Sequence, residues 1–257
     1  MRTTHLAPYL FAGFLVTVPY VLLAVDANAQ DGRQAGQTEA YGKTYGEWAA
    51  NWIQWAEAGP VGRNAITDTT GEFCDDNQPK GPVWFLAGTF GKVGVKRNCT
   101  IPRDRALFYP LVEGGWVDCP GTEDPNTSDA DVRAAIAVAL DAACQVTSTL
   151  DGVPISALQV QTVRAQSPKF RNILPNDLVP EVANSCTPAL VGGRTGRRIA
   201  DGYWVMLPPL SPGAHTLMLH GGVCAFPDPN DNSDPKRGRV VFENGVTYRL
   251  TVSGKDR

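Results

Sequence analysis

The sequence predicts a mainly β fold, an antiparallel β-sandwich of jelly-roll or immunoglobulin-like type with two packed α-helices. Three observations support this. The 257 residues include 26 glycines and 20 prolines, which indicates many turns and little continuous helix. From Leu150 onward, short apolar runs alternate with turn residues and show no helical period. Two segments in the first half carry helix signals. Strands separated by turns, with few helices, are typical of sandwiches.

The N-terminal segment has the order of a secretory signal peptide. Arg2 supplies the positive charge, the apolar run extends from Leu10 to Val25, and Ala27 and Ala29 give the small-residue cleavage pattern. The run is short for a membrane span. We expect cleavage after Ala29, which makes 1–29 the signal and 30–257 a single disulfide-stabilised β-rich domain. The sequence thus predicts export to the periplasm or extracellular space and no transmembrane segment in the mature chain.

The stretch "YGKTYGEWAANWIQWA" predicts an amphipathic helix. Thr44 and Glu47 have the spacing of a capping box, and Gly59 with Pro60 ends the helical pattern. At 100° per residue five aromatic residues fall within an arc of about 80°: Tyr41, Tyr45, Trp48, Trp52 and Trp55. A narrow apolar stripe favours a helix face that docks on a sheet, and a row of stacking platforms for a ligand is the alternative.

Two apolar runs, residues 81–91 and 105–112, read as buried strands. A second helix should follow the acidic loop near Asp129, with Thr127 or Ser128 as its N-cap. Its narrow apolar face would consist of Val132, Ile136, Ala139, Leu140 and Ala143.

Turn signals divide the C-terminal half into strands. Asp151-Gly152 and Asn244-Gly245 each predict a hairpin, because these dipeptides suit tight turns. Residues 201–222 read as strand, proline-rich turn and strand. The proline-rich residues 172–198 predict a long surface connection, and a domain linker is the alternative.

Six cysteines lie beyond the expected cleavage site: Cys74, Cys99, Cys119, Cys144, Cys186 and Cys224. An even number in an exported chain, without a C-x-x-C pair, indicates up to three disulfides. Spacing leaves fifteen connectivities open. We expect sequential pairing, Cys74–Cys99, Cys119–Cys144 and Cys186–Cys224.

Three segments, "GPVWFLAGTFG", "RNCTIPRDRALFYPLV" and "DGYWVMLPPLSPGAHTL", resemble a pattern found in a family of uncharacterised exported bacterial proteins. The resemblance extends over about residues 45–252. It implies an exported, single compact unit and carries no activity with it.

Candidate catalytic groups are few. Glu113 and Asp118 flank Trp116, and acids beside an aromatic ring are the ingredients of a sugar-processing site in which Trp116 would contact the ligand. His220 precedes two glycines at a strand end and could join such a site, whereas His215 reads as a structural residue at a strand corner. The two histidines are five residues apart, so on one strand they face opposite sides and would not share a metal.

Other ligand patterns are weaker. Alternate acidic and amide residues at Asp228, Asn230, Asn232 and Asp234 resemble a calcium loop, but Ser233 replaces the expected glycine and Arg239 the bidentate glutamate. We therefore expect no cofactor and no metal, with a structural calcium site as the alternative. Residues 191–198 are rich in Gly and Arg and read as a solvated basic loop rather than an anion site.

The net charge of −3 and the lack of a basic stripe exclude nucleic acid as a partner. Without a firm catalytic motif, the sequence favours an exported non-catalytic binding or surface-associated protein, with extracellular carbohydrate as its ligand. The alternative is a secreted glycan-active hydrolase or lyase that uses Glu113 and Asp118, with His220 as a further catalytic group.

Overall fold

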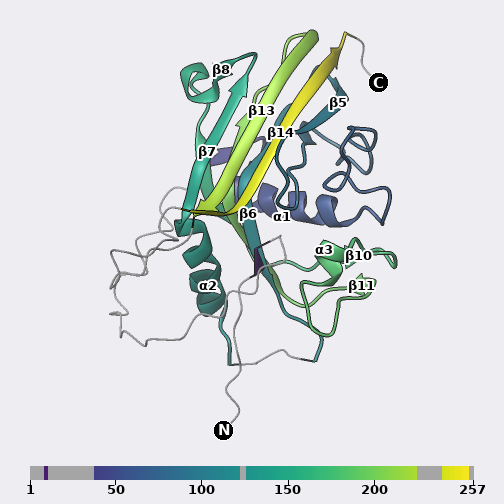
Figure 1. Cartoon of the computed structure of the whole chain (residues 1–257), viewed down its shortest axis with the longest axis vertical. Coiled ribbons are helices and arrows are strands. Elements are labelled where there is room, and N and C mark those ends of the chain that lie inside the picture. The colour runs from purple at the N-terminus through teal and green to yellow at the C-terminus, as the bar shows by residue number, and fades with distance from the viewer. Residues whose placement is uncertain (1–8, 11–37, 122–125, 225–238, 255–257) are drawn as a thin grey trace.

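Two β-sheets packed face to face form the frame of the computed structural model (Figure 1). The structure describes residues 9–10, 38–121, 126–224 and 239–254. Sheet I has the order β1 (Tyr9–Leu10), β6 (Ala106–Val117), β12 (Arg198–Leu207) and β9 (Thr162–Gln166), with β4 (Val83–Phe85) also beside β6. Sheet II has the order β5 (Val95–Pro102), β14 (Val240–Ser253), β13 (Gly213–Cys224), β7 (Ala143–Leu150) and β8 (Val153–Pro154).

This arrangement confirms a mainly β sandwich with helices. Most neighbouring strands are antiparallel, as expected, but β4 runs parallel to β6 and β5 runs parallel to β14. Both sheets are therefore mixed. Apart from β1, the expected signal peptide and its cleavage site lie outside the described residues.

The main core lies between the sheets. Leu107, Tyr109 and Leu111 of β6 are fully buried and pack against Leu217 and Leu219 of β13 and their neighbours on β14. The two sheets are in close contact at Gly221, where a Cβ would lie 2.3 Å from the carbonyl oxygen of Leu111. A side chain at this position would therefore separate the sheets.

The aromatic helix α1 (Tyr45–Glu57) covers the other face of sheet I. Its capping box forms as predicted, because the Thr44 side chain accepts from the Glu47 N–H and the Glu47 carboxylate accepts from the Thr44 N–H. The indole N–H groups of Trp48, Trp52 and Trp55 each donate to a backbone carbonyl, those of Ala40, Leu86 and Asp76 respectively. Burial of these rings confirms the docking face.

Tyr41 does not belong to that face. The helix begins at Tyr45, and Tyr41 lies in the turn between β2 (Glu39–Ala40) and β3 (Lys43–Thr44), with a positive φ and 42 % of its surface exposed. The helical period therefore does not reach it.

The second helix, α2 (Asp129–Asp141), lies on the same face of sheet I as sheet II and extends that layer (Figure 1). Ser128 is its N-cap, and Asp131 completes a capping box. The buried residues Val132 and Ile136 pack against Ile199, while Leu140 joins Val112 of β6.

One predicted hairpin is confirmed and the other is wrong. Asp151-Gly152 turns β7 into β8, with Leu150 paired to Val153. Asn244 and Gly245 instead lie inside the continuous strand β14. The Asn244 side chain is buried, accepts from the Thr89 N–H and donates to the Leu111 carbonyl, so tertiary contacts override its turn preference.

Three disulfides form, of which one has the predicted pairing. Cys74 is bonded to Cys99 as expected. The other two expected pairs are wrong, because the bonds join Cys119 to Cys186 and Cys144 to Cys224. The reason lies in the topology: the hydrogen bond from the Cys224 N–H to the Ala142 carbonyl brings the start of β7 beside the end of β13.

Residues 172–198 form a packed annex rather than a linker. They contain β10 (Ile173–Leu174), α3 (Pro180–Ala183) and β11 (Gly193–Arg194), while a short 3-10 helix, η2 (Ile155–Leu158), precedes them in the chain. Val182, Cys186 and Leu190 pack against Val117 at the end of β6. The Cys119–Cys186 disulfide fastens this annex to sheet I.

Candidate functional site

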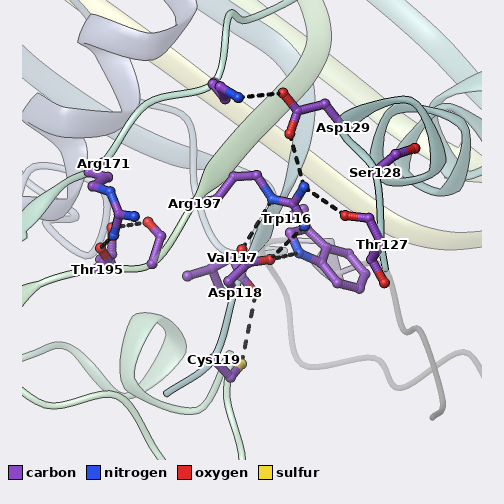
Figure 2. Close-up of polar contacts among 12 residues, drawn as sticks. Trp116, Val117, Asp118, Cys119, Thr127, Ser128, Asp129, Arg171, Thr195 and Arg197 are labelled. Carbon is purple, nitrogen blue, oxygen red and sulfur yellow. Dashed lines mark hydrogen bonds and ion pairs between the residues drawn. The ribbon is translucent and has the colours of Figure 1, made fainter. Parts of the chain in front are cut away.

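The predicted site residues Trp116 and Asp118 belong to a structural network (Figure 2). The Trp116 indole N–H donates to Asp118 over 2.7 Å, and the Arg197 guanidinium donates to both carboxylate oxygens of Asp118 at 3.1 Å. Ring atoms of Trp116 pack against the buried cluster of α2. Both predicted groups are therefore engaged within the protein.

Arg197 also binds the start of α2. Its Nη1 group donates to the Thr127 carbonyl and to Asp129, as Figure 2 shows. The hydrogen bond from Arg197, together with that from Lys169, holds the pKa of the Asp129 carboxyl below its usual range. Because the guanidinium bridges two acids and a carbonyl from separate segments, its main effect is to fasten α2 to the ends of β6 and β12.

Glu113 lies in a different environment. It pairs with Gly202 on sheet I, and its Oε2 atom is buried without a hydrogen-bond partner in the described structure. With Trp52, Phe90 and Asn244 it lines a pocket of about the size of one water molecule. Burial raises the pKa of Glu113 to about 8, the negative charge of Glu57 adds to the increase, and Arg198 opposes it. Glu113 as a residue is half-buried, and its Oε2 atom is shielded from solvent.

Glu113 and Asp118 do not converge on one cleft. A register shift in the β6–β12 pairing at Tyr203/Trp204 changes which residues of these strands face α1. Beyond this shift, Glu113 faces α1. Trp116, three residues later, faces α2, and its indole N–H donates to Asp118, which therefore lies on the α2 side. The acid whose negative charge raises the pKa of Glu113 is Glu57, a residue that the sequence did not identify as a candidate.

Glu57 and Arg198 complete the buried charges beneath α1. Arg198 donates to the Glu57 carboxylate, which also accepts from the Asn172 amide at 2.8 Å. Burial raises the pKa of Glu57, although Arg198 and Asn172 lower it. Because these side chains are buried, the arrangement suits a structural connection between α1 and sheet I.

The histidines lie on sheet II, apart from these acids. His220 Nδ1 is 3.1 Å from the Gln145 carbonyl, and Nε2 is 2.7 Å from Glu243. His215 has the predicted structural geometry: Nδ1 is 2.7 Å from Asp151 and Nε2 is 3.0 Å from the Ser211 carbonyl. The hydrogen bond to the Asp151 carboxylate raises the pKa of His215. The structure therefore does not bring His220 together with Glu113 or Asp118.

Sequence reasoning missed a polar surface, the exposed face of sheet II, which points away from sheet I. In Figure 1 the long strands β7, β13 and β14 that form it lie side by side. Its members are Lys96, Asn98, Thr100, Thr147, Thr149, Thr216, Met218, His220, Glu243, Thr247, Arg249 and Thr251. Alternating polar and apolar residues in β13 and β14 are the signal that could have found it.

The strand register arranges this face in rows. Thr149, Met218, Thr247 and Lys96 form one row across four strands. Thr216, Arg249 and Asn98 form the next. The side chains of Asn98, Thr216, Thr247 and Arg249 make no hydrogen bond or ion pair within the described part of the chain. They are therefore available to a ligand.

Among the described residues, no three His, Cys, Asp or Glu side chains are grouped to hold a metal ion. The calcium-like positions 228–234 lie outside the described residues. Within the described ranges, no helix combines the length and apolar character needed to cross a membrane. No protein-family model matches the chain, and no curated protein or solved structure matches it significantly.

Proposed function

We propose that this chain is an exported, non-catalytic binding protein that contacts extracellular polysaccharide through the exposed face of sheet II. One observation carries the proposal: two rows of side chains, one across four adjacent strands and one across three, include Asn98, Thr216, Thr247 and Arg249, which have no hydrogen-bond or ion-pair partner in the described structure. Hydroxyl, amide and guanidinium groups are donors and acceptors for sugar hydroxyls. The exposed Met218 side chain adds an apolar contact for a sugar ring.

The dimensions suit an extended chain. Adjacent strands lie about 4.8 Å apart, so a row across four strands spans roughly 14 Å. Residues two apart on one strand lie about 6.8 Å apart on the same face. Two neighbouring rows thus offer several contacts to a short stretch of polysaccharide, and weak individual contacts add along it.

The disulfides support a place outside the cytoplasm. Three disulfides join all six cysteines of the described chain. Such bonds persist in oxidising compartments and are rare in reducing ones. Together with the signal-peptide pattern, they favour the periplasm or the extracellular space.

The enzymatic alternative has less support. A glycan-active hydrolase would need Glu113 and Asp118 on either side of one scissile bond. Glu113 is instead beneath α1, and Asp118 is bound by Arg197. A raised pKa, such as that of Glu113, is a feature of general acids, and this is the observation that keeps the alternative open to test.

A polysaccharide panel tests both functions. Purified protein spanning residues 30–257 is applied to immobilised neutral and acidic polysaccharides, and both retention and reducing-end release are measured. Retention without release supports the binding function, and no retention on any of them overturns it. Release that is lost in Glu113→Gln and in Asp118→Asn supports the hydrolase instead.

A face variant locates the binding surface. Thr216→Ala with Thr247→Ala removes two hydroxyls from the exposed face of sheet II, and we expect retention to weaken by roughly tenfold, because each lost hydrogen bond contributes about 0.5–1.5 kcal/mol. Thr69→Ala, at an exposed loop position, is the control and should leave retention unchanged. Equal retention of the face variant and the unmodified protein would place binding elsewhere.

A further inference from the structure

Two cations stand on the exposed face of sheet II without an acidic partner. Lys96 of β5 pairs with Thr247 of β14, and Arg249 pairs with Asn98 in the same parallel ladder. Between them Arg97 and Tyr248 point inward, where the Arg97 guanidinium donates to the Tyr248 hydroxyl over 2.8 Å. The alternation of the two strands therefore directs Lys96 and Arg249 outward, on diagonal positions about 7–8 Å apart.

Both side chains are unpaired. Lys96 and Arg249 are exposed and take part in no ion pair or hydrogen bond within the described ranges. Glu243, which shares the face, lies 2.7 Å from His220. Asp151, at the end of β7, accepts the Thr216 N–H and contacts His215. Neither cation therefore has a counter-charge in contact with it among the described residues.

The cations are set among groups that suit a sugar rather than a bare anion. Arg249 has Thr216 and Asn98 as its neighbours across the strands. Lys96 shares its row with Met218, of which 50 % is exposed. In the next row Gly245 is covered by neighbouring side chains, because a Cβ there would lie 3.2 Å from the His220 ring and 3.4 Å from Val93.

We infer that the polysaccharide bound by this face is anionic, and that Lys96 and Arg249 bind its acidic groups while the threonines and Asn98 bind its hydroxyls. The guanidinium of Arg249 presents a planar fork of donors that matches the oxygens of a carboxylate or a sulfate, and Lys96 supplies a point charge. The inference rests on the proposed binding function and adds the chemical class of the ligand.

Three polymers with one backbone provide the test: dextran, carboxymethyl-dextran and dextran sulfate. Binding of each to purified residues 30–257 is measured by biolayer interferometry at about 20 mM and about 500 mM NaCl, because salt screens exposed charges. We expect at least one acidic dextran to bind roughly tenfold more tightly than dextran at low salt and to lose that advantage at high salt. Preference for the carboxymethyl or the sulfate form identifies which acid is bound.

Matched variants assign the effect to the two residues. Lys96→Gln with Arg249→Gln should lower binding to the preferred acidic dextran by roughly five- to tenfold and leave dextran binding unchanged. Lys80→Gln with Arg194→Gln removes the same charge from exposed positions outside this face and should retain binding. Circular dichroism and thermal melting verify that both double variants are folded.

Different outcomes would overturn the anionic ligand class and the polysaccharide-binding function. Equal binding of dextran and both acidic dextrans, with no effect of salt, would overturn the anionic ligand and leave the polysaccharide-binding function standing. Equal loss of binding in both double variants would overturn the role of Lys96 and Arg249. Equally tight binding of poly-glutamate would show a general polyanion surface and overturn the glycan site, and failure to bind any polysaccharide would remove the proposed function itself.

Discussion

Glu57, the last residue of α1, and Arg198, the first residue of β12, form a buried ion pair whose side chains are 0 % and 4 % exposed. The pair joins the aromatic helix to sheet I at the end opposite its capping box. Asn172 of the annex donates to the same carboxylate. Three segments that are distant in the sequence thus meet at one charged group.

Removal of the cation should be strongly destabilising. We expect Arg198→Met to lower the free energy of unfolding by about 3–5 kcal/mol, because Glu57 would remain buried without its counter-charge. Urea unfolding at pH 7 measures the loss. Adding Glu57→Gln to Arg198→Met should restore part of it, and Arg194→Met, an exposed arginine on β11, is the control. An unchanged urea midpoint in Arg198→Met would contradict a buried pair.

Glu113 should make the protein less stable as the pH rises. Its pKa is raised to about 8 in the folded protein, against about 4.5 in the unfolded chain. Between these values the folded state binds more protons, so stability is fully present below pH 4.5 and is lost progressively up to about pH 8. Glu113→Gln should therefore stabilise the protein at pH 8.5, by on the order of 1–3 kcal/mol, and have little effect near pH 4.

Glu47 provides a control of opposite sign for that experiment. Hydrogen bonds from the Thr44 backbone and side chain lower the pKa of Glu47. The contribution of Glu47 to the stability of the folded state is therefore present above its pKa in the unfolded chain. It is lost as the pH falls through its pKa in the folded protein. Glu47→Gln should narrow the stability difference between pH 7 and pH 3, while Glu113→Gln acts at alkaline pH. Parallel pH profiles for the two variants would contradict the burial of Glu113.

Local signals predicted local structure in this chain. The capping box at Thr44, the N-cap at Ser128, the aromatic face of α1 apart from Tyr41, and the Asp151-Gly152 turn depend on residues a few positions apart, and all are present. Asn244-Gly245 carried an equally strong turn signal. It failed because the Asn244 amide is bound by Thr89, 155 residues away, a contact that no local pattern encodes.

The positions of the candidate site residues depended on long-range strand pairing and were therefore harder to predict from the sequence. Spacing placed Glu113 and Asp118 near each other in the chain, but the register shift at Tyr203/Trp204 and the bond to Arg197 separate them in function. The alternation in β13 and β14 was visible in the sequence. The parallel pairing of β14 with β5, which brings Lys96 beside the row of Arg249, required the fold.

The disulfide connectivity offers a direct chemical check. Non-reducing proteolysis with mass spectrometry should recover a linked pair of peptides containing Cys119 and Cys186, and another containing Cys144 and Cys224. In the chain-entropy model, the separation of 80 residues makes the Cys144–Cys224 bond worth about 4.5 kcal/mol, against about 3.5 kcal/mol for the 25-residue separation of Cys74–Cys99.

Paired alanine variants test whether the Cys144–Cys224 disulfide stabilises the protein more than the Cys74–Cys99 disulfide. Cys144→Ala with Cys224→Ala should lower the melting temperature more than Cys74→Ala with Cys99→Ala, since the longer loop restricts the unfolded chain more. Both are measured without reductant, so that the remaining bonds stay closed. A linked peptide pair of Cys119 with Cys144 would contradict the topology that places β7 beside β13.

Gly221 tests the contact between the two sheets. An alanine Cβ at this position would lie 2.3 Å from the Leu111 carbonyl oxygen and 3.2 Å from the Val112 Cβ, so the sheets would have to separate. Backbone entropy alone favours alanine over glycine in a strand, whereas overpacking costs about 1–3 kcal/mol. The sign of the change in the free energy of unfolding therefore shows which effect is larger. We expect Gly221→Ala to lower the free energy of unfolding. Gly254→Ala, whose Cβ has no atom within 4 Å, should be neutral or slightly stabilising. Similar stability of both variants would mean that sheets I and II do not approach each other at Leu111.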